Sequence, residues 1–196
     1  MRALLTWAAL ITAIAVPLAV AATSPLLAWR QPIYIAAGFA GVIALALLLI
    51  QPLLAAGHLP GPNPRRARKI HRWVGATLVA AVLVHVGGLW ITSPGDVIDA
   101  LTFTSPTPFS AWGVIAMWAV FAAAVLAIFR KKLRLPLWRA LHGILALITV
   151  LGTIAHALLI EGTMGTWSKT ILCALVLIVT AKVLRDLRVF AILKRG

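Results

Sequence analysis

Apolar residues form six long runs along the chain, and the short connections between the runs hold most of the charged residues. Each run has about 20 residues, which is the length that a helix needs to cross a hydrocarbon core of about 30 Å. Helices are expected because open strands leave backbone groups unpaired in lipid, and the sequence lacks the alternating pattern of a barrel. The predicted spans are 4–22, 33–56, 70–91, 111–129, 137–160 and 167–184.

The composition supports this interpretation. Hydrophobic residues make up 62% of the chain and charged residues 11%, which excludes a water-soluble globular protein. Because the apolar runs occupy nearly all of residues 1–196, we expect a single all-α domain, an integral membrane bundle of six transmembrane helices. The one cysteine, Cys173, lies inside an apolar run, so the chain has no internal disulfide, CxxC redox pair or cysteine-based zinc site.

The charges predict the orientation of the bundle. The chain has 18 basic and 4 acidic residues, and 16 of the basic residues fall on one side of the predicted membrane. Lys and Arg mark the cytoplasmic face, so both termini are expected inside and the connection 92–110 outside. A net charge of +14 would suggest nucleic acid binding in a soluble protein, but topology accounts for it here and we expect no nucleic acid partner. The inward side holds Arg2, the basic residues of 65–72 and 130–139, and those from Lys182 onward.

The two ends of the chain have further features. The first run follows a single Arg and ends in Ala-Val-Ala-Ala at 19–22, so it also resembles a cleavable signal peptide. It is also long enough to span a membrane, so both interpretations stay open. Cleavage would leave the orientation of the other helices unchanged. Residues 185–196 alternate apolar and basic side chains, and we expect this short amphipathic tail to lie on the inner membrane surface.

Four of the five histidines form two pairs, His71 with His85 in the third span and His142 with His156 in the fifth. The members of each pair are 14 residues apart, so along a helix they lie within about 40° of one face and about 21 Å apart. The third and fifth spans run in the same direction. His71 and His142 are therefore expected at an inner level and His85 and His156 at an outer level.

Ionisable residues within a membrane are costly and usually functional. A proton relay would need carboxylates, which the spans lack. A zinc or copper site would need three or four ligands around one ion, whereas each level supplies two. Two axial imidazoles per level are what a six-coordinate heme iron takes, so the pattern favours one or two hemes.

Basic residues flank the inner level. Arg68 and Arg139 each precede an inner histidine by one turn, and Arg72 follows the first of them. We expect these three side chains to pair with heme propionates. On the outer side only Arg30 and Lys169 are available, so the outer heme has less support.

Glycines accompany both pairs. Gly75 lies one turn after His71 and Gly152 one turn before His156, and we expect them to leave room for a flat group beside the imidazoles. Other interpretations of these residues stay open. An intramembrane histidine can hydrogen-bond between helices, the arginines can be topological markers, and small residues also mark close helix packing. His58 has no register with the others and is expected to be an ordinary loop residue.

Two sequence stretches resemble a known family. They are Arg68-Lys-Ile-His71-Arg-Trp-Val-Gly75 running to His85, and Trp138-Arg-Ala-Leu-His142 running to His156. Within six spans they are similar to the ferric-reductase-like transmembrane domain of ferric reductases, NADPH oxidases and the heme subunit of the periplasmic methionine-sulfoxide reductase system. The resemblance covers essentially the whole chain. It implies b-type hemes that pass electrons across the membrane, with His71 and His142 ligating the inner heme and His85 and His156 the outer.

The resemblance also implies partners. Large members are fused to flavin and nicotinamide domains, but about a dozen residues follow the last span here, so we expect a separate donor, as in the stand-alone bacterial subunits. The chain would then be a multi-pass oxidoreductase component of a bacterial inner (cytoplasmic) membrane, without catalytic residues of its own. A cytosolic flavin reductase or a quinol would donate the electrons, and flavin or quinone would be supplied by or shared with this donor. A periplasmic reductase or a ferric complex would accept them.

Two alternatives belong beside this hypothesis. The first is a quinol-oxidising cytochrome b anchor subunit of another redox enzyme, which should have proton acceptors in a membrane-level pocket. The second is a metal or heme transport or assembly protein, which predicts discontinuous helices around the site. Spans 70–91 and 137–160 contain no proline, which disfavours the second alternative.

Overall fold

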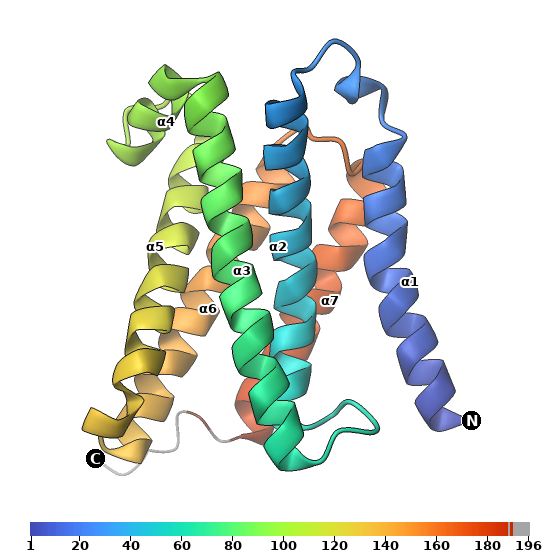
Figure 1. Ribbon diagram of the computed structural model, residues 1–196, viewed down its shortest axis with the longest axis vertical. Coiled ribbons are helices and arrows are strands. Elements are labelled where there is room, and N and C mark those ends of the chain that lie inside the picture. The colour runs from blue at the N-terminus through green and yellow to red at the C-terminus, as the bar shows by residue number, and fades with distance from the viewer. Residues whose placement is uncertain (188, 190–196) are drawn as a thin grey trace.

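The computed structural model of the chain is a helical bundle, and it describes residues 1–187 and 189 (Figure 1). The helices are α1 (Arg2–Ala22), α2 (Pro32–Ala56), α3 (Pro64–Thr92), α4 (Pro94–Leu101), α5 (Pro108–Ile128), α6 (Leu135–Leu159) and α7 (Thr166–Asp186), with short 3₁₀ helices η1 (Pro25–Leu27) and η2 (Phe129–Lys132). The described residues contain no strand, so the all-α prediction is confirmed. All of these α-helices except α4 are long and apolar enough to cross a membrane, which confirms the six predicted spans.

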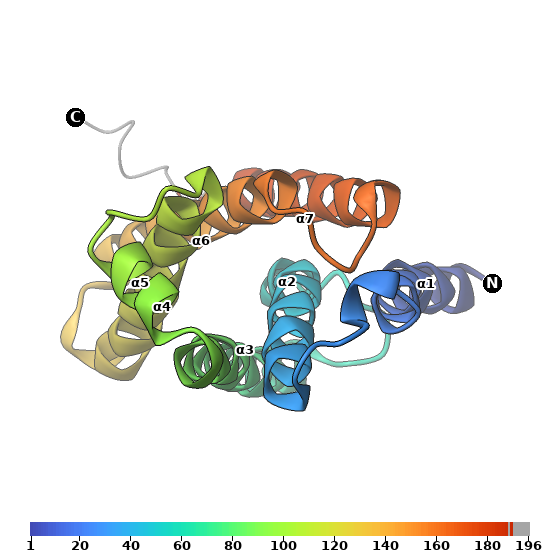
Figure 2. The same cartoon turned by 90° about the horizontal axis from the view of Figure 1, so that it is seen from above.

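The helices pack as two antiparallel hairpins with two further helices beside them. The most extensive contacts join α2 to α3 and α5 to α6, while α7 packs against α2 and α6. Figure 2 shows α1 at the edge of the bundle, where it contacts α7 and α2. The predicted surface segment 185–196 lies mostly outside the described residues.

The two ends of the bundle differ in charge. The start of α3, η2 and the end of α7 lie at the end where α1 begins, and we call this the basic end (Figure 1). The opposite end carries η1, α4 and the α6–α7 connection, and we call it the α4 end. The basic residues of 65–72 and 130–139 therefore gather at one end of the bundle, as the charge pattern predicts.

Helix α3 begins earlier than the hydropathy pattern predicts. The pattern placed its start at residue 70, whereas the helix starts at Pro64. Asn63 caps it, because its Oδ1 accepts the Arg66 N–H at 2.9 Å, and proline suits the first helical turn. The basic residues from 65 to 69 thus lie on the first turns of α3 and are fixed relative to His71, instead of belonging to a loop.

The predicted outer connection 92–110 contains a helix that the sequence analysis missed. Helix α4 follows directly after Ser93, with a proline in its first turn. Its Val97 is buried against the bundle, while Asp96 and Asp99 are exposed. The α4 end is therefore covered by an ordered element.

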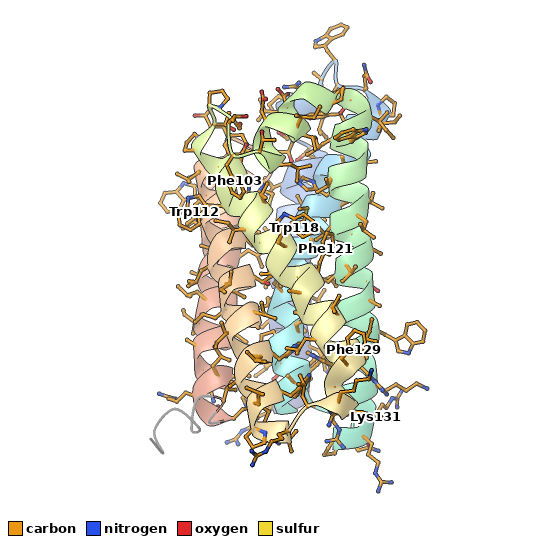
Figure 3. All side chains as sticks on the ribbon, turned by 90° about the vertical axis from the view of Figure 1, so that its left-hand side faces the viewer. Phe103, Trp112, Trp118, Phe121, Phe129 and Lys131 are labelled. Carbon is orange, nitrogen blue, oxygen red and sulfur yellow. The ribbon has the colours of Figure 1, made fainter. Side chains whose placement is uncertain are left out.

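The outer surface of the bundle is apolar. Figure 3 shows the aromatic side chains Trp112, Trp118 and Phe121 along α5 and Phe129 at the start of η2, with Lys131 at the basic end. Trp118 is 58% exposed and packs edge to face on Phe121, with ring centroids 6.0 Å apart. Large apolar side chains exposed over whole helices are expected where the surrounding solvent is lipid, since contiguous patches of this size are rare on soluble monomers.

Candidate functional site

The four predicted histidines meet in the predicted pairs inside the bundle. The ring centroids of His71 and His142 are 6.5 Å apart, and those of His85 and His156 are 6.4 Å apart. We call these the basic-end pair and the α4-end pair. The two imidazole planes cross at 71° in the basic-end pair and at 80° in the α4-end pair.

These distances suit one metal ion between the rings of each pair. A metal–imidazole bond of about 2 Å on each side places the two ring centroids roughly 6 Å apart. Within the described residues there is no group of three or more His, Cys, Asp or Glu side chains that could hold a metal ion. Each level thus offers two imidazole nitrogens, which fits the two axial positions of a heme iron and not a zinc site built from protein ligands.

Both rings of the α4-end pair are fixed by their hairpin partners. His85 Nδ1 lies 2.8 Å from the Ala37 carbonyl oxygen on α2, and His156 Nδ1 lies 2.9 Å from the Phe109 carbonyl oxygen on α5. A carbonyl only accepts hydrogen bonds, so Nδ1 carries the hydrogen in both rings. The lone pair of each neutral ring is then on Nε2, which is the arrangement that metal-ligating histidines need.

Two glycines that the sequence analysis missed make these contacts possible. Gly41 and Gly113 each lie one turn after the accepting carbonyl. A Cβ on Gly41 would lie 3.0 Å from His85 Nδ1, and one on Gly113 would lie 2.7 Å from His156 Nδ1. The sequence separation of the bonded residues is nearly the same in the two hairpins, 48 and 47 positions, so comparing the two hairpins could have found these contacts. The similar spacing of the histidines in the two hairpins thus extends to their carbonyl partners on α2 and α5.

The two glycines that the sequence analysis singled out, Gly75 and Gly152, lie against neighbouring helices. A Cβ on Gly75 would lie 3.0 Å from Gln51 Nε2, and one on Gly152 would lie 3.0 Å from the Trp112 carbonyl oxygen. Neither glycine lies against an imidazole. They let α3 approach α2 and α6 approach α5, the helix-packing role of small residues.

The basic-end pair is less symmetric than the α4-end pair. His71 Nδ1 lies 3.1 Å from the Gln51 carbonyl oxygen, whereas His142 Nδ1 is buried without a hydrogen-bond partner. The His142 ring instead stacks on Trp138, with centroids 5.1 Å apart and planes 11° apart. Trp138 donates its Nε1–H to the Leu126 carbonyl oxygen at 3.3 Å, and the Arg130 guanidinium lies 5.1 Å from the Trp138 ring centroid. Stacking orients His142 where the other three rings use a hydrogen bond.

The arginines predicted to bind propionates lie at the basic end. Arg68, Arg72 and Arg139 are exposed, and none makes an ion pair within the described part of the chain. Arg72 lies in a surface groove that contains neither histidine and is formed with Lys69, Trp73 and Ala76. The structure thus places three unpaired cations at the level of the basic-end pair without directing Arg72 toward it.

His58 lies apart from both pairs, as its position in the sequence predicts. It follows Gly57, which ends α2 in the left-handed conformation with φ of 67°. His58 Nε2 is 3.7 Å from the carboxylate of Asp186, which also pairs with Lys182 of the same helix. These contacts tie the α2–α3 connection to the end of α7 and indicate a structural role.

A cavity surrounds the α4-end pair. Its volume is about 550 Å³, within the range of small-molecule sites, and it is lined by both histidines and by Gly41 and Gly113. Residues of α2 to α7 contribute to it. The charged residues that line it are Arg30, Asp96, Asp99, Glu161 and Lys169. The arginine pattern favours a heme at the basic end, whereas this cavity lies at the α4 end.

Six helices long and apolar enough to cross a membrane, with two stacked pairs of facing imidazoles between them, define a multi-pass membrane protein with histidines inside the bundle. The family described as ferric reductase like transmembrane component matches residues 37–153, more than half of the chain. The chain belongs to this family, which confirms the resemblance. The match includes His71, His85 and His142 and ends three residues before His156. No curated protein and no solved structure gives a significant match.

Proposed function

We propose that the chain transfers electrons across a membrane through b-type heme held by the basic-end and α4-end pairs. The observation that carries the proposal is the α4-end pair, in which two rings 6.4 Å apart both use Nδ1–H to bind a carbonyl and keep Nε2 available. Family membership supports transmembrane electron transfer as the general activity. Heme bound there supplies one-electron iron chemistry.

The chain's own residues would bind and orient the cofactor. His71 and His142 are the proposed ligands at the basic end, and His85 and His156 those at the α4 end. Each pair draws one ligand from each hairpin, because α3 belongs to the first hairpin and α6 to the second. The two levels are separated by about 21 Å of helix, so the two pairs together span most of the hydrocarbon core.

We further propose that the basic end faces the cytoplasm of a bacterial inner membrane, with the N terminus and the end of α7 inside. An acidic flavin reductase would be attracted there by the exposed cations of α3 and η2, since complementary charge speeds encounter. The α4 end would then deliver electrons to a periplasmic reductase or a ferric complex.

Quinol is the second candidate donor, and one observation favours it. Within the described residues, His142 Nδ1 and Gln51 Oε1 are buried polar atoms without hydrogen-bond partners, and Gln51 already contacts His71 through its backbone. Buried polar atoms are normally paired, so Gln51 Oε1 can accept a hydrogen bond from a bound hydroxyl, and His142 Nδ1–H, with Nε2 on the metal, can donate one to its oxygen. The transport alternative loses support because α3 and α6 are continuous through both histidine levels.

The experiment that tests the function is a dithionite-reduced minus oxidised spectrum, with heme and protein quantified on the same sample. His71→Ala and His142→Ala should remove the basic-end heme, and His85→Ala and His156→Ala the α4-end heme. His58→Ala is the matched control and should keep the wild-type heme content. A wild-type protein without heme, produced with ample iron and heme precursor, would overturn the proposal.

A further inference from the structure

Lys169 is a buried cation next to the α4-end cavity. It lies in the first turn of α7 and is 8% exposed. Its Nζ is 2.7 Å from the Ile160 carbonyl oxygen and 3.4 Å from that of Leu158. Both carbonyls belong to the C-terminal end of α6, where unpaired carbonyl groups and the helix dipole favour a positive charge.

These contacts leave the ammonium group incompletely satisfied. A lysine ammonium has three N–H donors, and the backbone takes two of them, one at a long distance. In the described part of the chain, ion pairs join Asp186 to its neighbours and none includes Lys169. Since a helix end carries only about half an elementary charge, a buried ammonium group next to it still lacks a full counter-charge.

The cavity is where such a counter-charge can enter. Lys169 lines it together with both histidines of the α4-end pair. The acidic residues of the lining, Asp96, Asp99 and Glu161, are all exposed and can keep their hydration, and so can the exposed Arg30. Lys169 is therefore the buried cation of a cavity whose other charges are solvated at its rim.

We propose that Lys169 binds a carboxylate inside this cavity. Two sources have this chemistry: a propionate of a heme held by the α4-end pair, and a carboxylate group of an anionic electron acceptor that enters from the α4 end. The first source rests on the proposed function, whereas the second requires only the cavity and the charge.

Lys169→Gln is the variant that separates charge from helix capping, because a glutamine amide can still donate to the Ile160 carbonyl. Lys169→Arg keeps the charge and should behave like the wild type. Lys182→Gln, an exposed position on the same helix, is the matched control. The readouts are the heme-to-protein ratio, and the rate at which dithionite-reduced protein is reoxidised by ferric citrate or by hexaammineruthenium(III), each ion accepting one electron.

The outcomes distinguish the two sources. Loss of the α4-end heme in Lys169→Gln identifies the propionate. Unchanged heme content, with reoxidation by ferric citrate slowed about tenfold and reoxidation by the cationic ruthenium complex unchanged, identifies the carboxylate of an acceptor. If Lys169→Gln matches Lys182→Gln in heme content and in both rates, the inference is wrong although the proposed function stands.

A heme-free wild type would remove the proposed function and the first source but would still leave the second source open to test. Binding of redox-inert gallium citrate to the wild type and to Lys169→Gln, measured by equilibrium dialysis, then decides the matter. Weaker binding to Lys169→Gln supports the carboxylate site, and equal binding or no binding overturns it.

Discussion

Replacing Gly113 by alanine tests how the α4-end pair is built. The new Cβ would lie 2.7 Å from His156 Nδ1, 3.0 Å from Cε1 and 3.3 Å from Cγ. The imidazole has to turn or withdraw, because the obstacle is the body of the ring itself and not the end of a flexible chain. Its hydrogen bond to the Phe109 carbonyl oxygen, 2.9 Å long, is then lost.

The substitution changes both the heme affinity and the stability of the fold, and its contributions to stability have opposite signs. Losing the partner that orients a metal-ligating histidine lowers metal affinity about 10- to 100-fold. Alanine in place of glycine within a helix stabilises that helix by about 0.5–1 kcal/mol. A buried N–H left without a partner costs about 1–3 kcal/mol, so the net loss of fold stability is about 0 to 2.5 kcal/mol. We therefore expect a folded protein with strongly reduced heme at the α4 end.

The assay is the heme-to-protein ratio of Gly113→Ala with its reduced-minus-oxidised spectrum, measured at limiting heme. Gly87→Ala is the matched control, because a Cβ there meets no atom within 4 Å and Gly87 does not line the α4-end cavity. Gly41→Ala should show a weaker loss than Gly113→Ala, since its closest contact is 3.0 Å and not 2.7 Å. Equal heme content and identical spectra in Gly113→Ala and Gly87→Ala would refute the reasoning.

Three further predictions follow from the geometry. Imidazole planes crossed at 71° and 80° would leave dxz and dyz of a heme iron between them nearly degenerate, so EPR of the oxidised protein should show highly anisotropic low-spin signals, and rhombic signals would contradict this. Trp138→Leu removes the ring stacked on His142 and should lower the basic-end heme content while the α4-end heme stays, as read from the heme-to-protein ratio. Asn63→Ala removes the cap of α3 and should lower stability by about 1 kcal/mol, seen as a lower Tm at unchanged heme content, and an unchanged Tm would show that the cap is dispensable.

The spans and the histidine pairs could be predicted from the sequence because both depend on periodicity along single helices. Hydropathy over about 20 residues marks a span, and a separation of 14 residues returns to nearly the same helix face. Alternate crossings then place His71 level with His142 and His85 level with His156. The centroid distances of 6.5 and 6.4 Å agree with that reasoning.

The supporting contacts could not be predicted because they depend on how neighbouring helices are rotated about their axes. Gly75 is close to His71 in sequence, yet it faces Gln51, whereas Gly113 is far from His156 in sequence and lies against its ring. His71 and His142 share the same preceding arginine spacing, but only His71 has a backbone acceptor.

Helix ends were the other source of error. The Asn63 cap and the short α4 are decided by a few local hydrogen bonds, which a window of hydropathy averages away. The sequence pattern therefore placed the apolar middle of α3 correctly and put its first turns in a loop.

The hydrogen bonds that orient three of the four histidines stay within a hairpin, α3 to α2 or α6 to α5. Each hairpin can therefore enter the bilayer as a unit and orient its own ligands before it meets the other. Heme bound as proposed would take its two ligands at each level from two different hairpins, so both hairpins would have to be in place before it is held. A chain that receives no heme would therefore still hold His71 and His85 in position through their hydrogen bonds to α2.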